Sequence, residues 1–187
     1  MKAYFGLNVV NTKPYDIRGP PGDFKKEADW SSAMELIRNI FPKTNAIRMY
    51  STTDGLYRHL MSAIPAAQKH DFSILAGVWS GGPEAVGRFD SERLALKEVV
   101  EKHGCANLAA VSVGNEDLYT ASAMHVSATQ MKDTAQLLVT QITAVRKVLR
   151  DAGCCDTPVT HTDTWNELVD NAYASNVSPY NVSENSS

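Results

Sequence analysis

Short apolar runs alternate along this chain with segments of helical periodicity. The runs are bounded by polar or turn residues, which is typical of β-strands. Five such runs span residues 4–10, 46–50, 73–79, 108–113 and 158–165. Between them, apolar residues recur with the spacing of an amphipathic helix. Two of these stripes are Trp30, Ala33, Met34, Ile37 and Phe41, and Met131, Ala135, Leu138, Ile142, Val145 and Leu149. The pattern predicts strands alternating with helices that each have a core face.

Candidate helix ends agree with this reading. Residues whose side chains can accept hydrogen bonds from free backbone amides stand at three expected helix starts: Asp29, Asp90 and Ser127. Gly104 and Gly153 stand where two of the helices should stop. The helix expected over residues 56–70 contains Pro65, which should kink it.

The strands have two chemically different faces. In the run Ile47, Arg48, Met49, Tyr50 the apolar side chains share one face, and in residues 111–116 the valines oppose a serine, a glycine and a glutamate. A strand of a doubly wound sheet is covered by helices on both faces and reads as continuously apolar, whereas a barrel strand has helices outside and a layered interior. The pattern therefore favours an α/β fold of the (β/α)8 TIM-barrel type.

Composition excludes several classes of function. The length of 187 residues fits one domain with a sizeable core. A formal net charge of −3 with scattered basic residues argues against a nucleic-acid partner, and no basic amphipathic segment indicates membrane binding. The chain has neither a signal-peptide pattern nor an apolar run long enough to span a bilayer. Cys105, Cys154 and Cys155 lack metal-site spacing and are interpreted as one optional bridge or free thiols.

Polar and aromatic side chains gather on the faces expected to point into the barrel. Most stand at the carboxyl ends of strands, where barrel enzymes hold their catalytic groups. They are Asn8, Arg48, Tyr50, Trp79, Glu116, His161, Asp163 and Trp165. Aromatic faces pack on sugar rings while polar groups bind hydroxyls, so this set favours an uncharged saccharide ligand. No cofactor is expected.

Some members of this set have other interpretations. His161 and Asp163 share one strand face and, with Glu116, suit a metal site, but their spacing is too common to be specific, and no metal is expected. The two tryptophans suit packing at the barrel mouth as well as a sugar platform. The arginine suits an ion pair inside the barrel.

Five segments carry a family resemblance, in order along the chain. They are Phe5-Gly-Leu-Asn8, Ile47-Arg-Met-Tyr50, Leu75-Ala-Gly-Val-Trp79, Ser112-Val-Gly-Asn-Glu116-Asp-Leu-Tyr119 and His161-Thr-Asp-Thr-Trp165. Over roughly residues 4–170 the chain resembles family 17 glycoside hydrolases, the fungal cell-wall glucan endo-1,3-β-glucosidases. The resemblance implies a barrel of retaining enzymes that act on β-1,3-glucan. Glu116 matches their acid/base glutamate, Asn115 matches the position that commonly contacts the sugar 2-hydroxyl, and Tyr119 is a further expected substrate contact.

The resemblance stops before the family's nucleophile. Retaining hydrolysis needs a second carboxylate about 5–5.5 Å from the acid, and the family's Glu-x-Gly-Trp segment has no match here. About the first five βα units are therefore expected, over residues 1–171, followed by a polar Asn/Ser-rich tail, residues 172–187, that is predicted to be disordered. Asp163 is an alternative nucleophile, although a substrate contact or a partner for Arg48 or His161 is favoured.

Two functional hypotheses follow. The first is a retaining glycoside hydrolase of the endo-β-1,3-glucanase type, secreted or in the cell wall as the resemblance implies, with activity impaired because the nucleophile segment is missing. The second is a truncated, non-catalytic remnant that binds β-glucan through Trp79 and Trp165.

Overall fold

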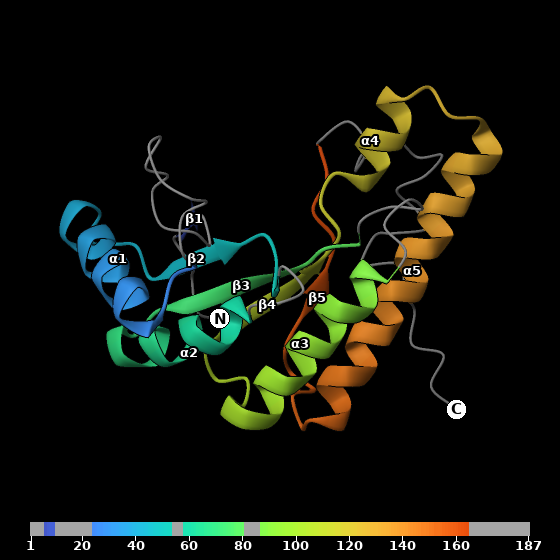
Figure 1. Ribbon diagram of the computed structural model, residues 1–187. Coiled ribbons are helices and arrows are strands. Elements are labelled where there is room, and N and C mark those ends of the chain that lie inside the picture. The colour runs from blue at the N-terminus through green and yellow to red at the C-terminus, as the bar shows by residue number, and fades with distance from the viewer. Residues whose placement is uncertain (1–5, 10–23, 54–57, 81–86, 165–187) are drawn as a thin grey trace.

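Strands and helices alternate through the part of the chain that the structure describes (Figure 1). The computed structural model describes residues 6–9, 24–53, 58–80 and 87–164. Its strands are β1 (Gly6–Val9), β2 (Ala46–Met49), β3 (Ser73–Val78), β4 (Leu108–Val113) and β5 (Val159–Thr160). Its helices are α1 (Glu27–Ile40), α2 (His59–His70), α3 (Arg88–His103), α4 (Asp117–Ala123) and α5 (Ala128–Asp151). The predicted alternation is thus confirmed, with α4 as a short helix that the sequence pattern did not indicate.

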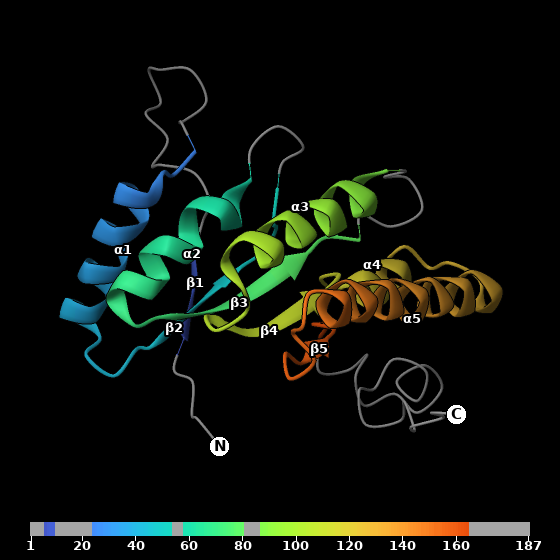
Figure 2. The same ribbon diagram turned by 90° about the horizontal axis from the view of Figure 1, so that it is seen from below.

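The strands form one parallel sheet in the order β1-β2-β3-β4-β5. A doubly wound sheet reverses its strand order at a switch point, whereas a barrel adds each strand beside the last. Helices α1, α2, α3 and α5 lie along one side of the sheet in chain order (Figure 2). The fold is therefore a partial β/α barrel built from its first five strands, as the strand pattern predicted.

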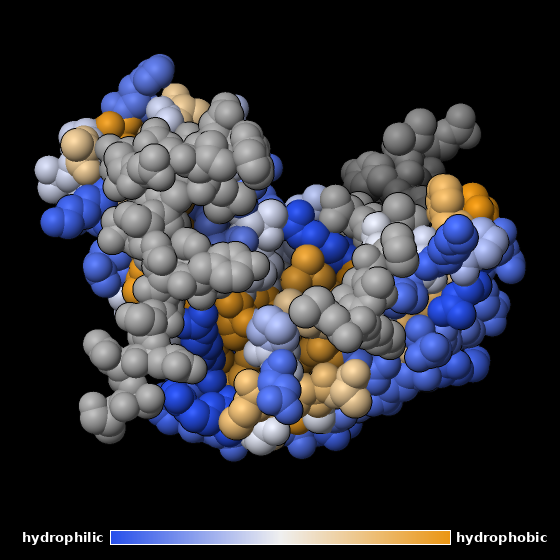
Figure 3. Space-filling view, turned by 180° about the vertical axis from the view of Figure 1, so that it is seen from behind, coloured by the Kyte–Doolittle hydropathy of each residue, from blue (hydrophilic) through white to orange (hydrophobic). Residues whose placement is uncertain are grey.

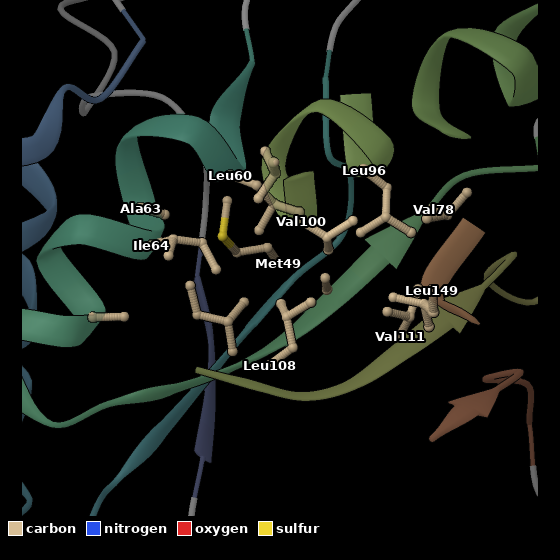
Figure 4. Packing of buried hydrophobic residues seen from close by; sticks show 14 of the residues in the cluster. Met49, Leu60, Ala63, Ile64, Val78, Leu96, Val100, Leu108, Val111 and Leu149 are labelled. Atoms are coloured by element: carbon tan, nitrogen blue, oxygen red, sulfur yellow. The ribbon is translucent and has the colours of Figure 1, made fainter. Parts of the chain in front are cut away.

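The main hydrophobic core lies between the sheet and these helices (Figure 4). Met49 projects from the sheet toward Ile64 of α2, and Val111 lies against Leu149 of α5; each of the four is at most 2% exposed. Burying a side chain of this size stabilises the fold by about 1.5–3 kcal/mol. The alternation in the strands has thus placed one apolar face under the helices.

The opposite face of the sheet has no covering helix among the described elements. Seen from that side, hydrophobic surface gathers in a central hollow (Figure 3). Leu75 of β3 pairs in register with Ala110 of β4, and both are half-buried. Apolar side chains on this face are what a barrel interior requires, since its layers of side chains pack against each other.

Two of the three predicted N-caps are wrong. Ser127 caps α5 as expected, since its hydroxyl accepts a hydrogen bond from a backbone amide of the first turn. By contrast, α1 begins three residues earlier than expected, and Asp29 accepts from the backbone N–H of Lys26 at 2.9 Å as the N3 member of a capping box. Asp90 lies in the first turn of α3, whose N-cap is Gly87.

The predicted helix ends hold. Gly104 is the C-cap of α3, and Gly153 follows the C-cap of α5 with φ 76°. Helix α2 continues through Pro65.

No helix in the described ranges combines the length and apolar character that crossing a bilayer requires. The predicted tail, residues 172–187, lies outside the described residues.

The cysteines form one bridge. Cys105 and Cys154 are joined by a disulfide, and Cys155 is an exposed free thiol. The bridge connects the end of α3 to the segment after α5, so it ties two neighbouring outer helices together at the end of the sheet opposite the expected site.

Candidate active site

Glu116 stands exposed beyond the carboxyl end of β4, as the N-cap of α4. Its backbone is left-handed, with φ 56° and ψ 33°. Its N–H donates to the carbonyl of Thr162 at 2.9 Å, and its own carbonyl accepts from the N–H of Thr120 at 2.8 Å. A side-chain-bearing residue in this region costs about 1–3 kcal/mol, and such residues cluster at functional sites. The contacts on both sides keep Glu116 in this conformation.

The turn that delivers Glu116 depends on Gly114. Its φ is 74°, and a Cβ at this position would meet the carboxylate of Asp117. That carboxylate accepts hydrogen bonds from the backbone N–H of Asn115 at 2.7 Å and from the hydroxyl of Ser80. Burial raises the pKa of Asp117, although these hydrogen bonds and the nearby His161 partly oppose the rise. Backbone freedom and lack of side-chain volume are therefore both required of Gly114.

A buried pair, His161 and Asp163, supports α4 from β5's side of the site. Their side chains are 2% and 0% exposed. The Asp163 carboxylate accepts from the backbone N–H of Leu118 at 2.9 Å and of Tyr119 at 3.2 Å, both in the first turn of α4. It also accepts from the N–H of Thr164 at 2.8 Å and pairs with His161 Nε2 at 2.9 Å. Asp163 thus ties the first turn of α4 to the segment after β5.

The hydrogen bonds of His161 and Asp163 influence the charges of this pair. His161 Nδ1 lies 2.7 Å from the carbonyl of Val113, which can only accept, so Nδ1 carries a proton. Donation from Nε2 to the Asp163 carboxylate then requires a second proton. Burial alone would lower the pKa of His161, but the hydrogen bonds to Asp163 and Val113 outweigh it and raise that pKa. Burial likewise opposes ionisation of Asp163, yet its hydrogen bonds with His161 and the backbone lower its pKa. Both pKa shifts favour an imidazolium paired with a carboxylate.

Arg48 links β2 to the turn before Glu116. Its guanidinium donates to Asn115 Oδ1 at 2.7 Å and lies 4.5 Å from the ring centre of Tyr50, a cation–π distance. Because the amide oxygen accepts from arginine, the Asn115 NH₂ is the part of the amide that can donate to a ligand. The structure therefore joins three of the predicted site residues in one contact chain.

Three aromatic residues of the predicted site are exposed. Tyr50 follows β2 and Trp79 follows β3, each with 43% of its surface exposed, while Tyr119 on α4 is 46% exposed. The backbone carbonyl of Tyr50 passes so close over Gly77 of β3 that a Cβ there would overlap it. Glycine at position 77 thus allows the end of β2 to approach β3 closely.

Not every predicted site residue can be placed. Asn8 pairs with Arg48 in the parallel register of β1 and β2, but its side chain lies outside the described residues, as does Trp165. Among the described residues, no three His, Cys, Asp or Glu side chains are grouped so that they could hold a metal ion. The individual roles of the predicted site residues remain predictions.

The sequence pattern missed the residues that hold the site in shape. Ser80 and Asp117 fix the turn before α4, and the hydroxyls of Ser112 and Thr162 bond each other at 2.7 Å across β4 and the segment after β5. A signal for Asp117 existed, because an aspartate directly after the glutamate occupies a helix start, where a carboxylate is favourable. Nothing in the periodicity marks Ser80 or Thr162.

The chain is similar in sequence to fungal proteins that act on glucan. Residues 11–182 match the BtgE/BtgC glycoside hydrolase domain. "Probable glucan endo-1,3-beta-glucosidase eglC" of Emericella nidulans is 31% identical over 158 residues, which are 81% of this chain and 33% of that protein. "Glucan 1,3-beta-glucosidase" of Schizosaccharomyces pombe is 28% identical over 80% of this chain and 42% of its own length. The chain thus spans about a third of the length of the first of these curated relatives.

A solved structure supports the fold. The exo-beta-1,4-mannosidase Op5Man5 from Opitutaceae bacterium strain TAV5 superposes with a TM-score of 0.52 at 13% sequence identity, over 78% of this chain and 30% of that one. At this identity the likeness concerns the architecture alone. The match over residues 11–182 covers most of the sequence, and the chain belongs to the BtgE/BtgC glycoside hydrolase domain family.

Proposed function

We propose that this chain carries the acid/base half of a retaining β-1,3-glucan hydrolase site of the family 17 type, with Glu116 as the general acid/base. The observation that carries the proposal is an exposed glutamate, held in a left-handed backbone at the end of β4, beside the Arg48–Asn115 contact. The substrate class is supported by the printed names of the relatives from Emericella nidulans and Schizosaccharomyces pombe, which refer to 1,3-β-glucan.

In this mechanism Glu116 first protonates the glycosidic oxygen as the bond to the anomeric carbon breaks. Its carboxylate then takes a proton from the water that hydrolyses the glycosyl intermediate. Asn115, oriented by Arg48, donates its NH₂ to a sugar hydroxyl. Tyr50 and Trp79 pack against sugar rings, because both expose aromatic surface at neighbouring strand ends. We infer a secreted or cell-wall location from the same relatives.

A second candidate is β-glucan binding without turnover. Retaining chemistry requires a second carboxylate that is free to attack the anomeric carbon. The two carboxylates that adjoin the Glu116 turn, Asp117 and Asp163, are instead bonded to backbone amides. Both carboxylates are therefore poor nucleophiles. As far as the described residues go, this favours β-glucan binding without turnover for this chain.

Hydrolysis and binding of a linear β-1,3-glucohexaose by the wild type and Glu116→Gln test the proposal. We expect the substitution to lower any hydrolysis by roughly 10²–10⁴-fold, the usual contribution of a general acid, and to leave hexaose affinity nearly unchanged. Glu101→Gln, an exposed change on α3, is the matched control. Binding without hydrolysis by the wild type supports the second candidate, and absence of both contradicts the proposal.

A chimera extends the test to a chain of the relatives' length. Residues 1–164 are joined to the remaining part of the Emericella nidulans relative. If this protein hydrolyses β-1,3-glucan and retains that activity after Glu116→Gln, Glu116 is not the acid/base.

A further inference from the structure

A buried carboxyl on α3 fastens the loop that follows β2. Glu92 is 0% exposed. Its Oε1 lies 2.6 Å from the hydroxyl of Ser51, and its Oε2 lies 2.7 Å from the backbone N–H and 2.5 Å from the hydroxyl of Thr52. Three hydrogen bonds from two consecutive residues therefore converge on one side chain that the proposed mechanism does not use.

This cluster has fewer hydroxyl protons than hydrogen-bond acceptors for them. The Ser51 hydroxyl also lies 2.5 Å from the carbonyl of Thr53, and the Thr52 hydroxyl lies 2.9 Å from the backbone carbonyl of Glu92. Each hydroxyl has one proton for two acceptors, so a proton on Glu92 would satisfy one contact more than an ionised carboxylate. Burial raises the pKa of Glu92, while the hydrogen bonds from Ser51 and Thr52 and the charge of Arg88 partly oppose this. A glutamine reproduces both shape and hydrogen bonding of such a group.

This cluster is linked to both aromatic residues at the strand ends. Tyr50 directly precedes the two residues that bind Glu92. On the other side, Arg88 lies one helical turn before Glu92, with its Nε 3.9 Å from Glu92 Oε1. The Arg88 guanidinium lies 3.9 Å from the ring centre of Trp79. One buried side chain thus connects the backbone behind Tyr50 with the cation stacked on Trp79.

We propose that Glu92 is a positioning residue that holds Tyr50 and Trp79 as paired aromatic walls of a surface for linear β-glucan. The identity of the ligand rests on the proposed function, whereas the positioning rests on the contacts of Glu92 alone. Neither ring is fixed by burial, since each is 43% exposed. The Tyr50 ring is stacked on Arg48 and the Trp79 ring on Arg88. Glu92 holds the backbone that follows Tyr50 and lies beside Arg88, so it sets where these two supports stand relative to each other.

The first measurement needs no ligand. Glu92→Leu keeps the side-chain size and helix propensity but removes the hydrogen bonds, whereas Glu92→Gln keeps them. We expect Glu92→Leu to speed hydrogen exchange of the Thr52 amide by about tenfold or more and to shift the Trp79 indole NMR signal, and Glu92→Gln to change both much less. The indole of Trp30, bonded to Ser62 between α1 and α2, is an internal control that should not move.

The second measurement is the affinity for β-1,3-glucohexaose. We expect Glu92→Leu to weaken binding by about tenfold and Glu92→Gln by less than about threefold. Val99→Ala creates a cavity in the core two turns further along α3, lowers Tm, and should leave hexaose affinity unchanged. This control separates positioning from a general loss of stability.

Each result decides one of the two proposals. If Glu92→Leu matches the wild type in the Thr52 and Trp79 signals and in affinity, Glu92 does not position the rings. If the wild type binds no hexaose, the proposed function fails, while the ligand-free signals still decide whether Glu92 positions the rings. Should Glu92→Leu not fold, Ser51→Ala removes one of the same hydrogen bonds and is expected to shift the same signals in the same direction.

Discussion

The two sides of the candidate site are held by different chemistry. Beside β4 and β5, the backbone that carries Glu116 is fixed by the ion pair of His161 and Asp163 together with backbone amides. Beside β2 and β3, the aromatic rings are fixed through Glu92, whose partners are mostly hydroxyls. The first arrangement is built on a buried ion pair, whereas the second combines hydrogen bonds from hydroxyls with arginines stacked on the rings. A buried ion pair therefore secures the residue proposed for catalysis, and hydroxyl contacts together with stacked arginines secure the residues proposed for binding.

Breaking the ion pair of His161 and Asp163 should have the largest effect on stability. Asp163→Ala leaves a buried imidazolium without its partner and frees two amides of α4, so we expect a loss of about 3–5 kcal/mol in the free energy of unfolding. Urea unfolding measures it. Asp133→Ala, an exposed change on α5, should stay within about 0.5 kcal/mol of the wild type. A loss of less than about 1 kcal/mol for Asp163→Ala would contradict the view that this pair carries the turn.

The next effect tests the turn itself. Gly114→Ala adds a Cβ at φ 74° that overlaps the Asp117 carboxylate, whereas Gly153→Ala adds one at φ 76° with no atom within 4 Å. The left-handed backbone costs both variants about 1 kcal/mol, and the overlap should cost Gly114→Ala at least about 1 kcal/mol more. Thermal unfolding compares the two. Equal losses of stability in the two variants would show that the Asp117 side chain moves aside without cost.

The helix-facing side of the sheet was predictable, because burial imposes a period on the sequence. Ile47, Met49, Val111 and Val113 alternate along their strands and are all buried under the helices. The barrel order followed from the difference between the two faces of each strand, which a sheet covered by helices on both sides would not show. The same reasoning marked Glu116 and placed it at a strand end.

The contacts that hold the site were not predictable in this way. Glu92 sits on a helix whose neighbouring glutamates are surface residues, and only the fold brings it against Ser51 and Thr52, about forty positions earlier. For Asp163 the sequence suggested a substrate contact, a partner for Arg48 or His161, or a nucleophile, and the contact with His161 is present. Its hydrogen bonds to α4 were not predicted, since a sequence does not show which backbone amides will donate to a carboxylate. Likewise, the left-handed backbone of Glu116 has no residue signature. Polar contacts between residues far apart in the sequence produce no periodic pattern along it.

A smaller effect concerns the left-handed backbone of Glu116, beside the ion pair of His161 and Asp163. Glycine adopts φ 56° without a Cβ penalty, so Glu116→Gly should raise the free energy of unfolding by up to about 1 kcal/mol. Glu116→Ala removes the carboxylate but keeps the strain, and should show no such gain. Chemical unfolding of both variants separates charge from backbone effects. A stabilised Glu116→Ala with an unchanged Glu116→Gly would contradict this account.

The smallest effect should be a pH dependence of stability that arises from His161 in its pair with Asp163. The pKa of His161 is raised above its ordinary 6.5, so its contribution to stability is fully present below pH 6.5 and is lost as the pH rises through the raised value. The stability difference between the wild type and His161→Gln should therefore shrink from pH 6 toward pH 9. The lowered pKa of His103 acts in the opposite direction, but it cancels in this difference. Loss of the proton removes one partner of Asp163 while three backbone amides remain, which keeps the change below that of Asp163→Ala. Urea unfolding across this pH range measures it, and a difference that stays constant would mean that His161 is not charged in the folded protein.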